Sequence, residues 1–190
     1  NTAQIEGLTS DQVAKLGATQ LAALSSAQLA AMQTEDLKQL GTSQLGYLNQ
    51  NIFGGMGTAQ VANMGSDQIA ALGALQVKQL STANIKALTS DQVKALSLAA
   101  VQSLTSAQVA ALVSTQVSSL ATSRIKALDS AQVGSLSAGV INAMDEDQIK
   151  AITEYTGLSD LETIERDTVS EHLATTGSGG GPNPAARIVM

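Results

Sequence analysis

A large apolar residue recurs at every eighth position of the chain, from Leu8 to Ile152, without one insertion or deletion. If residue 8k is position 1 of each eight-residue unit, or octad, position 6 is apolar in all nineteen octads, from Ile5 to Ile149. Position 5 is Gln in thirteen of the nineteen, and positions 2 and 3 are mostly Ser, Thr, Gly or Asp. A fixed period of this kind is typical of a repeat array, in which neighbouring units bury one another.

The eight-residue period does not fit one continuous helix. Eight residues at about 100° each carry an apolar stripe about 80° beyond two full turns, so the stripe would wind around the helix. Coiled coils need seven- or eleven-residue periods instead. Strands are also disfavoured, because alternation is absent and Ala, Gln and Lys are poor strand formers. The period therefore predicts many short elements.

Helix-capping signals recur at the start of the octads. In the segment 88–93, Thr89 can act as an N-cap, and Gln92 completes a capping box three residues later. Leu88 and Val93 then form the hydrophobic staple around that cap. The same pairing recurs at Thr9 and Gln12, Ser25 and Gln28, and Thr105 and Gln108. The chain is thus predicted to be an all-α solenoid, with one helix of about five to seven residues in each octad.

Two details follow from this capping scheme. Where position 2 is Gly, as at Gly17, we expect that residue to end the preceding helix in a left-handed conformation. The glutamine is expected to act only as a cap. Replacing Gln108 by Ala should then cost about 1 kcal/mol or less, the value of one lost cap bond.

The pattern divides the chain into three segments. Residues 1–156 are the octapeptide-repeat solenoid, and residues 157–176 are a C-terminal capping helix that begins at Ser159. Residues 177–190 are a Gly/Pro linker followed by a short apolar tail. This tail is either a disordered end of the chain or a docking segment that inserts into a neighbouring subunit.

One octad departs clearly from the repeat. Residues 48–55 lack the position-5 Gln, carry the only Phe of the chain, Phe53, and end in Gly-Gly. The departure is either a defect that the array tolerates, or a bend or contact with another chain. The candidate subunit-contact residues are therefore Phe53, Ile188, Val189 and Met190.

The residues that carry chemistry are almost absent. The chain has no Cys, and His172 is its only His, so neither a catalytic triad nor a zinc cluster can be assembled. The acidic run 145–147 opens an octad helix, which favours a capping role over a calcium site or a catalytic carboxylate pair. We expect no enzyme, no catalytic or metal-binding residue and no cofactor.

Charge and apolar content limit the partners. Residues 1–152 hold ten acids and eight bases without a basic stripe, and the whole chain has three aromatic residues, so nucleic-acid binding is not expected. No apolar run is long enough to predict a membrane span. Exposed Ser and Thr rows are potential sites for glycan decoration.

The octads LTSDQVAK, LTSDQVKA and LTSAQVAA resemble the LTxxQVxAL octapeptide tracts of large secreted or surface-attached bacterial proteins described as adhesin-like. The resemblance covers about residues 1–152. It implies an extracellular or cell-surface location and a structural or adhesive role, and it transfers no catalytic residue. The chain opens at Asn1 without an initiator Met, which suggests a trimmed N-terminus, with a removed leader as one cause.

The functional hypothesis is a rod or filament subunit that associates head-to-tail. The alternative is a solenoid binding module that presents a surface to a protein or glycan partner. A binding module usually carries variable aromatic or charged residues along one exposed face. The exposed positions of these octads are instead monotonous, with almost no aromatic residues.

Overall fold

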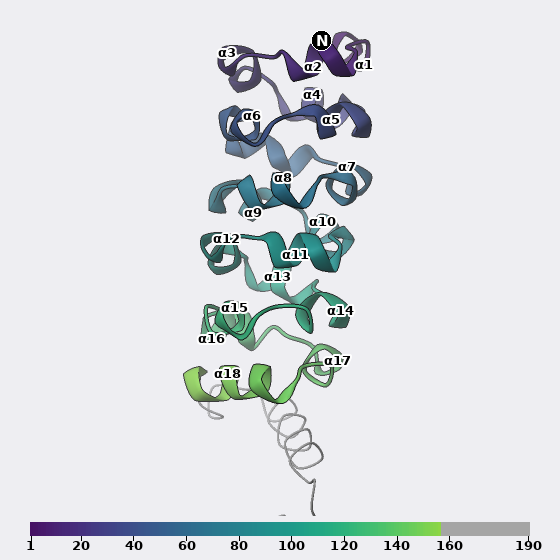
Figure 1. Ribbon diagram of the computed structural model, residues 1–190. Helices are drawn as coiled ribbons and strands as arrows, with labels where there is room; N and C mark the ends of the chain where they lie inside the picture. Colours follow the sequence, from purple (N-terminus) through teal and green to yellow (C-terminus); the bar gives the residue numbers. More distant parts are fainter. Residues whose placement is uncertain (157–190) are drawn as a thin grey trace, which may run out of the picture.

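The computed structural model describes residues 1–156, which form a slender superhelix of short helices (Figure 1). The helices of the first seven octads are α1 (Thr2–Glu6), α2 (Ser10–Ala14), α3 (Ala18–Ala22), α4 (Ser26–Ala31), α5 (Thr34–Gln39), α6 (Thr42–Tyr47) and the 3-10 helix η1 (Gln50–Gly55). The next six are α7 (Thr58–Asn63), α8 (Ser66–Ala71), α9 (Ala74–Gln79), α10 (Thr82–Ala87), α11 (Ser90–Ala95) and α12 (Leu98–Ser103). The last six are α13 (Ser106–Ala110), α14 (Ser114–Val117), α15 (Thr122–Ile125), α16 (Ser130–Val133), α17 (Ala138–Ile141) and α18 (Glu146–Thr156).

This architecture confirms the predicted all-α solenoid with one helix per octad. Helices α1 to α17 contain four to six residues, slightly fewer than predicted, and α18 contains eleven. Residues 1–156 contain no strand. The expected capping helix at 157–176 with Ser159, His172, and the linker and tail at 177–190 with Ile188, Val189 and Met190 lie outside the described residues.

In the middle of the rod, as between α9 and α10, the turn between helices is made by two consecutive extended residues at positions 1 and 2. Leu80 ends α9 with φ −61° and ψ 140°, and its N–H donates to the Val77 carbonyl oxygen at 3.1 Å. Ser81 follows in the same region, with φ −68° and ψ 159°, and caps α10. The extended pair turns the chain while the position-1 side chain stays in the core.

The expectation of left-handed glycines at position 2 is wrong. Gly17, Gly41, Gly57, Gly65 and Gly73 all have φ between −66° and −85° and ψ between 152° and 167°. The extended pair already makes the turn, so no residue with positive φ is needed there.

The core is a thin column of aliphatic side chains at positions 1 and 6. Val77 and Leu80 are buried, as are their counterparts in nearly every octad. The exceptions are Leu8, Leu16 and Leu24 of the first coil, which are only partly buried because the structure has no coil before them. Each octad therefore depends on the coils on either side for its burial.

Successive coils are offset by between three and four octads. Helix α8 packs against α11, and α9 packs against α12, so each helix contacts the third one after it. Hydrogen bonds between neighbouring coils join residues 25 to 31 positions apart. This spacing is the superhelical repeat that the sequence did not reveal.

The irregular octad 48–55 is a tightly packed part of the core. Phe53 is 0% exposed, so its side chain is a core residue and offers no surface for the predicted subunit contact. The octad forms the 3-10 helix η1, which packs against α4 and α9. A Cβ atom on Gly55 would lie 2.8 Å from the Ser26 carbonyl oxygen, so only Gly fits at this approach.

Helix α18 confirms the capping role of the acidic run. The Asp145 carboxylate accepts the Gln148 backbone N–H at 2.8 Å. Glu146 pairs with Lys150 at 2.6 Å on the surface of the same helix. Both contacts hold the first turn of the helix.

Replacing Gly55 by Ala should destabilise the protein by about 1–3 kcal/mol, because the added methyl group meets backbone that cannot move away. Gly46→Ala is the matched control. A Cβ atom there has nothing within 4 Å, so the loss of chain entropy in the unfolded state should stabilise by about 0.5–1 kcal/mol. Urea unfolding followed by circular dichroism measures both. Equal stabilities for the two variants would contradict the close approach of η1 and α4.

Candidate functional site

The position-5 glutamine completes the cap of its own helix, as predicted. In α13 the Gln108 side-chain oxygen accepts the Thr105 backbone N–H at 2.9 Å. The Thr105 hydroxyl oxygen in turn accepts the Gln108 backbone N–H at 3.2 Å. The same reciprocal pair forms at Thr9 and Gln12, Ser25 and Gln28, and Thr89 and Gln92.

The same side chain has a second role that the sequence analysis missed. The Gln108 side-chain nitrogen donates to the Leu80 carbonyl oxygen at 2.7 Å and to the Val77 carbonyl oxygen at 3.0 Å. Both acceptors belong to the end of α9 in the preceding coil. Helix ends leave carbonyl groups without intrahelical partners, and this amide supplies the missing donor. Because Gln108 is 2% exposed, both roles are fulfilled away from water.

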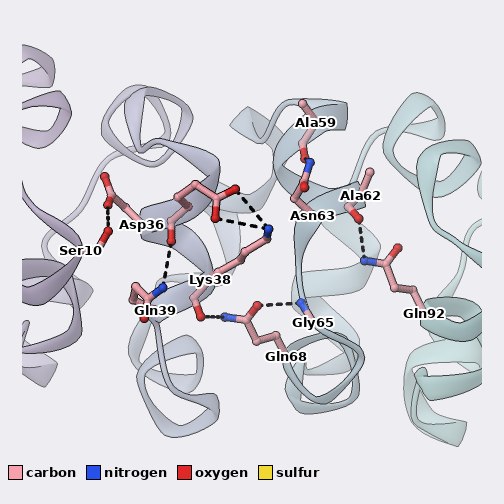
Figure 2. A network of polar contacts seen from close by, with 11 residues as sticks. Ser10, Asp36, Lys38, Gln39, Ala59, Ala62, Asn63, Gly65, Gln68 and Gln92 are labelled. Atoms are coloured by element: carbon pink, nitrogen blue, oxygen red, sulfur yellow. Dashed lines mark hydrogen bonds and ion pairs between the residues drawn. The ribbon is translucent and has the colours of Figure 1, made fainter.

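Figure 2 shows two further steps of this arrangement. The Gln68 side-chain oxygen accepts the Gly65 backbone N–H at 2.9 Å. The Gln68 side-chain nitrogen donates to the Lys38 carbonyl oxygen of the previous coil at 3.4 Å. The Gln92 nitrogen reaches the Ala62 carbonyl oxygen at 3.3 Å. One amide group therefore links the start of one helix to the end of another.

We call these coil-to-coil contacts the glutamine ladder. Its members are Gln44, Gln60, Gln68, Gln76, Gln92, Gln108, Gln116, Gln132 and Gln148, and each donates to the carbonyl of the position-1 residue 28 positions earlier. The ladder runs from the first coil boundary to α18. The ladder therefore fixes the alignment of each coil on the next through directional hydrogen bonds as well as through apolar contacts.

Octads without Gln interrupt or modify the ladder. Asn84 keeps one contact, since its shorter side chain donates to the Met56 carbonyl oxygen at 2.9 Å. Arg124 does the same through Nε, which donates to the Leu96 carbonyl oxygen at 3.1 Å. Ile52, Ala100 and Val140 have no side-chain donor at this position. The fold thus tolerates single gaps.

Asp36 replaces the ladder contact with a different link between coils. Its carboxylate is buried and accepts the Ser10 hydroxyl at 2.6 Å (Figure 2). The adjacent Gln33 side chain donates to the Glu6 carbonyl oxygen at 3.2 Å. The neighbouring ion pair between Lys38 and Glu35, at 3.2 Å, is exposed and contributes little.

The two ends of the described rod are different. In the first coil the side-chain oxygens of Gln4, Gln12, Gln20 and Gln28 act as cap acceptors, but their amide nitrogens have no partner within residues 1–156. Towards the other end, the carbonyl groups of Leu128, Leu136 and Met144 receive no ladder donor from the described residues. Within the described residues, the ladder therefore begins with the donor Gln44 and ends with the acceptor Leu120.

Residues 1–156 contain no group of three or more His, Asp or Glu side chains that could hold a metal ion. None of the helices described is long and apolar enough to cross a membrane. Of the predicted contact residues, Phe53 is in the core, and the three tail residues lie outside the described part. Among the described residues, the glutamine ladder is the feature that indicates a function.

The second role of the glutamine had a signal in the sequence. A capping box accepts Glu as readily as Gln at this position, because only an oxygen acceptor is needed. Yet position 5 is Gln in thirteen octads and Glu in none. That exclusive choice indicates a requirement for the amide N–H donor.

A family model described as the ALTTAQ repeat matches residues 53–82 and residues 69–98. The chain is a repeat protein, similar to the ALTTAQ repeat over these two overlapping stretches. The corresponding segment Ala87–Gln92 reads ALTSDQ, so the matched motif ends at the ladder glutamine. No curated protein matches the chain.

Replacing Gln108 by Ala should cost about 2–4 kcal/mol, because it removes the cap bond and leaves buried carbonyl groups without a donor. This value replaces the smaller cost expected from a cap alone. The matched control is Gln20→Ala, because Gln20 is exposed and loses only its 2.9 Å cap bond with Gly17, about 1 kcal/mol or less. Chemical denaturation compares the two.

A third variant separates the two roles. Gln108→Glu keeps an oxygen for the cap but replaces the amide donor by a carboxylate that faces carbonyl oxygens. It should be at least as destabilising as Gln108→Ala at neutral pH. Wild-type stability in Gln108→Glu would disprove the ladder contact.

Proposed function

We propose that this chain is a structural repeat protein, a stiff rod or filament subunit at the bacterial cell surface or outside the cell. We expect the rod to act as a spacer or in adhesion, and not as an enzyme. The observation that carries the proposal is the glutamine ladder, which ties each coil to the next through buried hydrogen bonds. The residues of the octads are used for regular shape, and no described cluster is arranged for chemistry.

The glutamine ladder should make the rod rigid. Aliphatic contacts are non-directional, so coils held only by Leu and Val could slide or bend at small cost. A buried amide that must reach two helices at once is sensitive to small shifts, since an unpaired buried polar group is costly. Bending or slippage would break several such bonds together. A rod of this kind holds its length.

Head-to-tail association would use the same contact that joins neighbouring coils within the chain. The exposed side-chain amides of Gln4, Gln12 and Gln20 occupy the position whose amide, in later coils, donates to carbonyl groups of the preceding coil. A head-to-tail contact of this type is heterologous, so it continues into a line of subunits unless a rotation closes it. The predicted tail docking through Ile188, Val189 and Met190 is a second route to the same assembly.

The location is proposed from the LTxxQVxAL resemblance. Exposed Ser and Thr residues at positions 2 and 3, such as Ser81 and Thr82, are consistent with a surface that carries glycans. Adhesion would then use the length of the rod and its decoration instead of one binding pocket.

Purified full-length chain should form linear assemblies whose length rises with protein concentration, seen by electron microscopy and sedimentation velocity. Gln12→Glu with Gln20→Glu should shorten them to single rods. Glutamate keeps the oxygen that caps each helix but removes the free amide donor at the edge. Folding should therefore be unchanged by circular dichroism.

The control for charge is Gln50→Glu with Asn63→Asp, which adds the same two charges at exposed positions in the middle of the rod. It should assemble like the wild type. A chain ending at Thr176 tests whether the tail contributes. Single rods from the wild type at every concentration would rule out head-to-tail association.

Protease added to intact cells of the source bacterium should degrade the protein while a cytoplasmic marker survives, because we place it outside the cell. Immunoblots against both proteins measure this. Equal protection of the two proteins would contradict the surface location and would leave the rod architecture untouched.

A further inference from the structure

The ladder glutamines are not spread evenly along the rod. Three consecutive octads, residues 56–79, each carry one: Gln60, Gln68 and Gln76. Two more consecutive octads, residues 104–119, carry Gln108 and Gln116. On either side of these runs, octads without a position-5 Gln interrupt the series. The ladder is therefore divided into continuous and interrupted segments.

The interrupted segments share one pattern, which we call a joint: a single ladder glutamine between two octads without one. Within residues 32–151 the joints are residues 32–55 around Gln44, residues 80–103 around Gln92 and residues 120–143 around Gln132. The octad before the glutamine carries Asp, Asn or Arg at position 5, and the octad after it carries Ile, Ala or Val. The interruptions therefore recur in the same order.

The middle joint, residues 80–103, covers most of one coil boundary, because ladder partners are 28 residues apart. Only Gln92 makes the full contact, and its side-chain nitrogen donates to the Met64 carbonyl oxygen at 2.7 Å. Asn84 makes a single contact, with the Met56 carbonyl oxygen at 2.9 Å. Ala100 has no side-chain donor. One buried glutamine thus carries most of the directional bonding of this boundary.

The Ala100 side of the boundary is joined in another way. Helix α12 packs against α9 through apolar contacts, which are non-directional. The Ser103 hydroxyl also donates to the Ala74 carbonyl oxygen at 2.8 Å. Ser103 is partly exposed, so water can replace this bond at small cost, whereas breaking the buried Gln92 bonds leaves polar groups without partners. The Ala100 side should therefore open more easily than the Gln92 side.

Gln92 lies between the two weaker octads in space as well as in sequence. Figure 1 shows α10 and α12 on opposite edges of the rod, with α11 between them. Asn84 belongs to α10, Gln92 to α11 and Ala100 to α12. A boundary bonded mainly at α11 resists separation there and can tilt towards either edge.

We propose that residues 80–103 form a flexible joint, at which neighbouring coils tilt and open locally while residues 56–79 and 104–119 stay closed. The shared pattern assigns equivalent joints to residues 32–55 and 120–143. This inference rests on the rod function proposed above and deepens it, because the rod is then stiff in segments and bends at fixed points. A spacer of this kind changes direction under load without unfolding.

Hydrogen–deuterium exchange of the full-length chain, followed by mass spectrometry, tests the middle joint. Backbone N–H groups of residues 80–103 should exchange at least about 10-fold faster than those of residues 56–79 and 104–119, because local opening exposes them. Fraying from the ends of the rod cannot produce this pattern, since the joint lies between the two protected segments.

Filling the gaps tests the cause of the opening. Asn84→Gln with Ala100→Gln gives the joint the residue that position 5 carries in most octads. Exchange in residues 80–103 should then slow at least about 10-fold, towards the rate of residues 56–79. The matched control is Ala99→Gln, which adds an amide at an exposed position of the same helix, outside the ladder position. It should leave the exchange rates unchanged.

A second variant covers the case in which the buried site of Ala100 does not accept the larger side chain. Asn84→Gln alone only lengthens an existing donor by one methylene group. It should slow exchange in the joint at least about 3-fold, because a second full ladder contact forms. Circular dichroism checks that each variant is folded.

Distances between spin labels measure the tilt directly. The chain has no cysteine, so Ala70→Cys with Ala110→Cys gives one labelled pair at exposed positions on either side of the joint. The distance distribution should be broad in the otherwise unchanged chain and narrower when Asn84→Gln is added.

Uniform exchange across residues 56–119 would overturn the proposal, as would a joint whose exchange and distance distribution respond to neither gap-filling variant. Both results would leave the proposed rod and its linear assemblies in place. A wild type that forms only single rods would, conversely, leave the exchange pattern as the test of the joint.

Discussion

The rod depends on one amide group that serves two helices at once. The oxygen of the position-5 glutamine satisfies the N–H at the start of its own helix, and the nitrogen satisfies carbonyl groups at the end of a helix in the preceding coil. Helices of four to six residues have nearly all their backbone groups at an end, so the demand for such partners is unusually high. A side chain with both a donor and an acceptor meets that demand at both helices with a single residue.

The need to fill a thin core and to satisfy helix ends explains why some octad positions accept substitutions more readily than others. Core positions 1 and 6 accept any aliphatic residue of suitable size, and Phe53 is accepted only with a local change to a 3-10 helix and a glycine at the close approach to Ser26. Ladder positions accept gaps when they are isolated, as at Ala100, because the coils above and below remain tied. Stability is therefore shared between neighbours, as expected of a quasi-one-dimensional array.

A structure of this kind has two classes of surface. The edges of each coil carry the groups that join it to its neighbours, amide donors on one edge and carbonyl acceptors on the other. The sides display the residues at positions 3, 4, 7 and 8, which vary from octad to octad, with Gly55 as a fixed exception. On the sides, Tyr47, Leu75 and Leu98 are the exposed large apolar residues of the described part.

The sequence by itself determined the octad period, the helical class, the capping boxes at pairs such as Thr105 and Gln108, and the inward placement of positions 1 and 6, because these depend on residues within one octad. Only the tertiary structure decided the number of octads in a coil, the burial of the glutamines, the core position of Phe53 and the alignment of α6, α9 and α12 on one edge. These features depend on the angle between successive helices, which the extended residues at positions 1 and 2 set. That angle adds up over 25 to 31 residues before two coils meet, so no local pattern of side chains reports it.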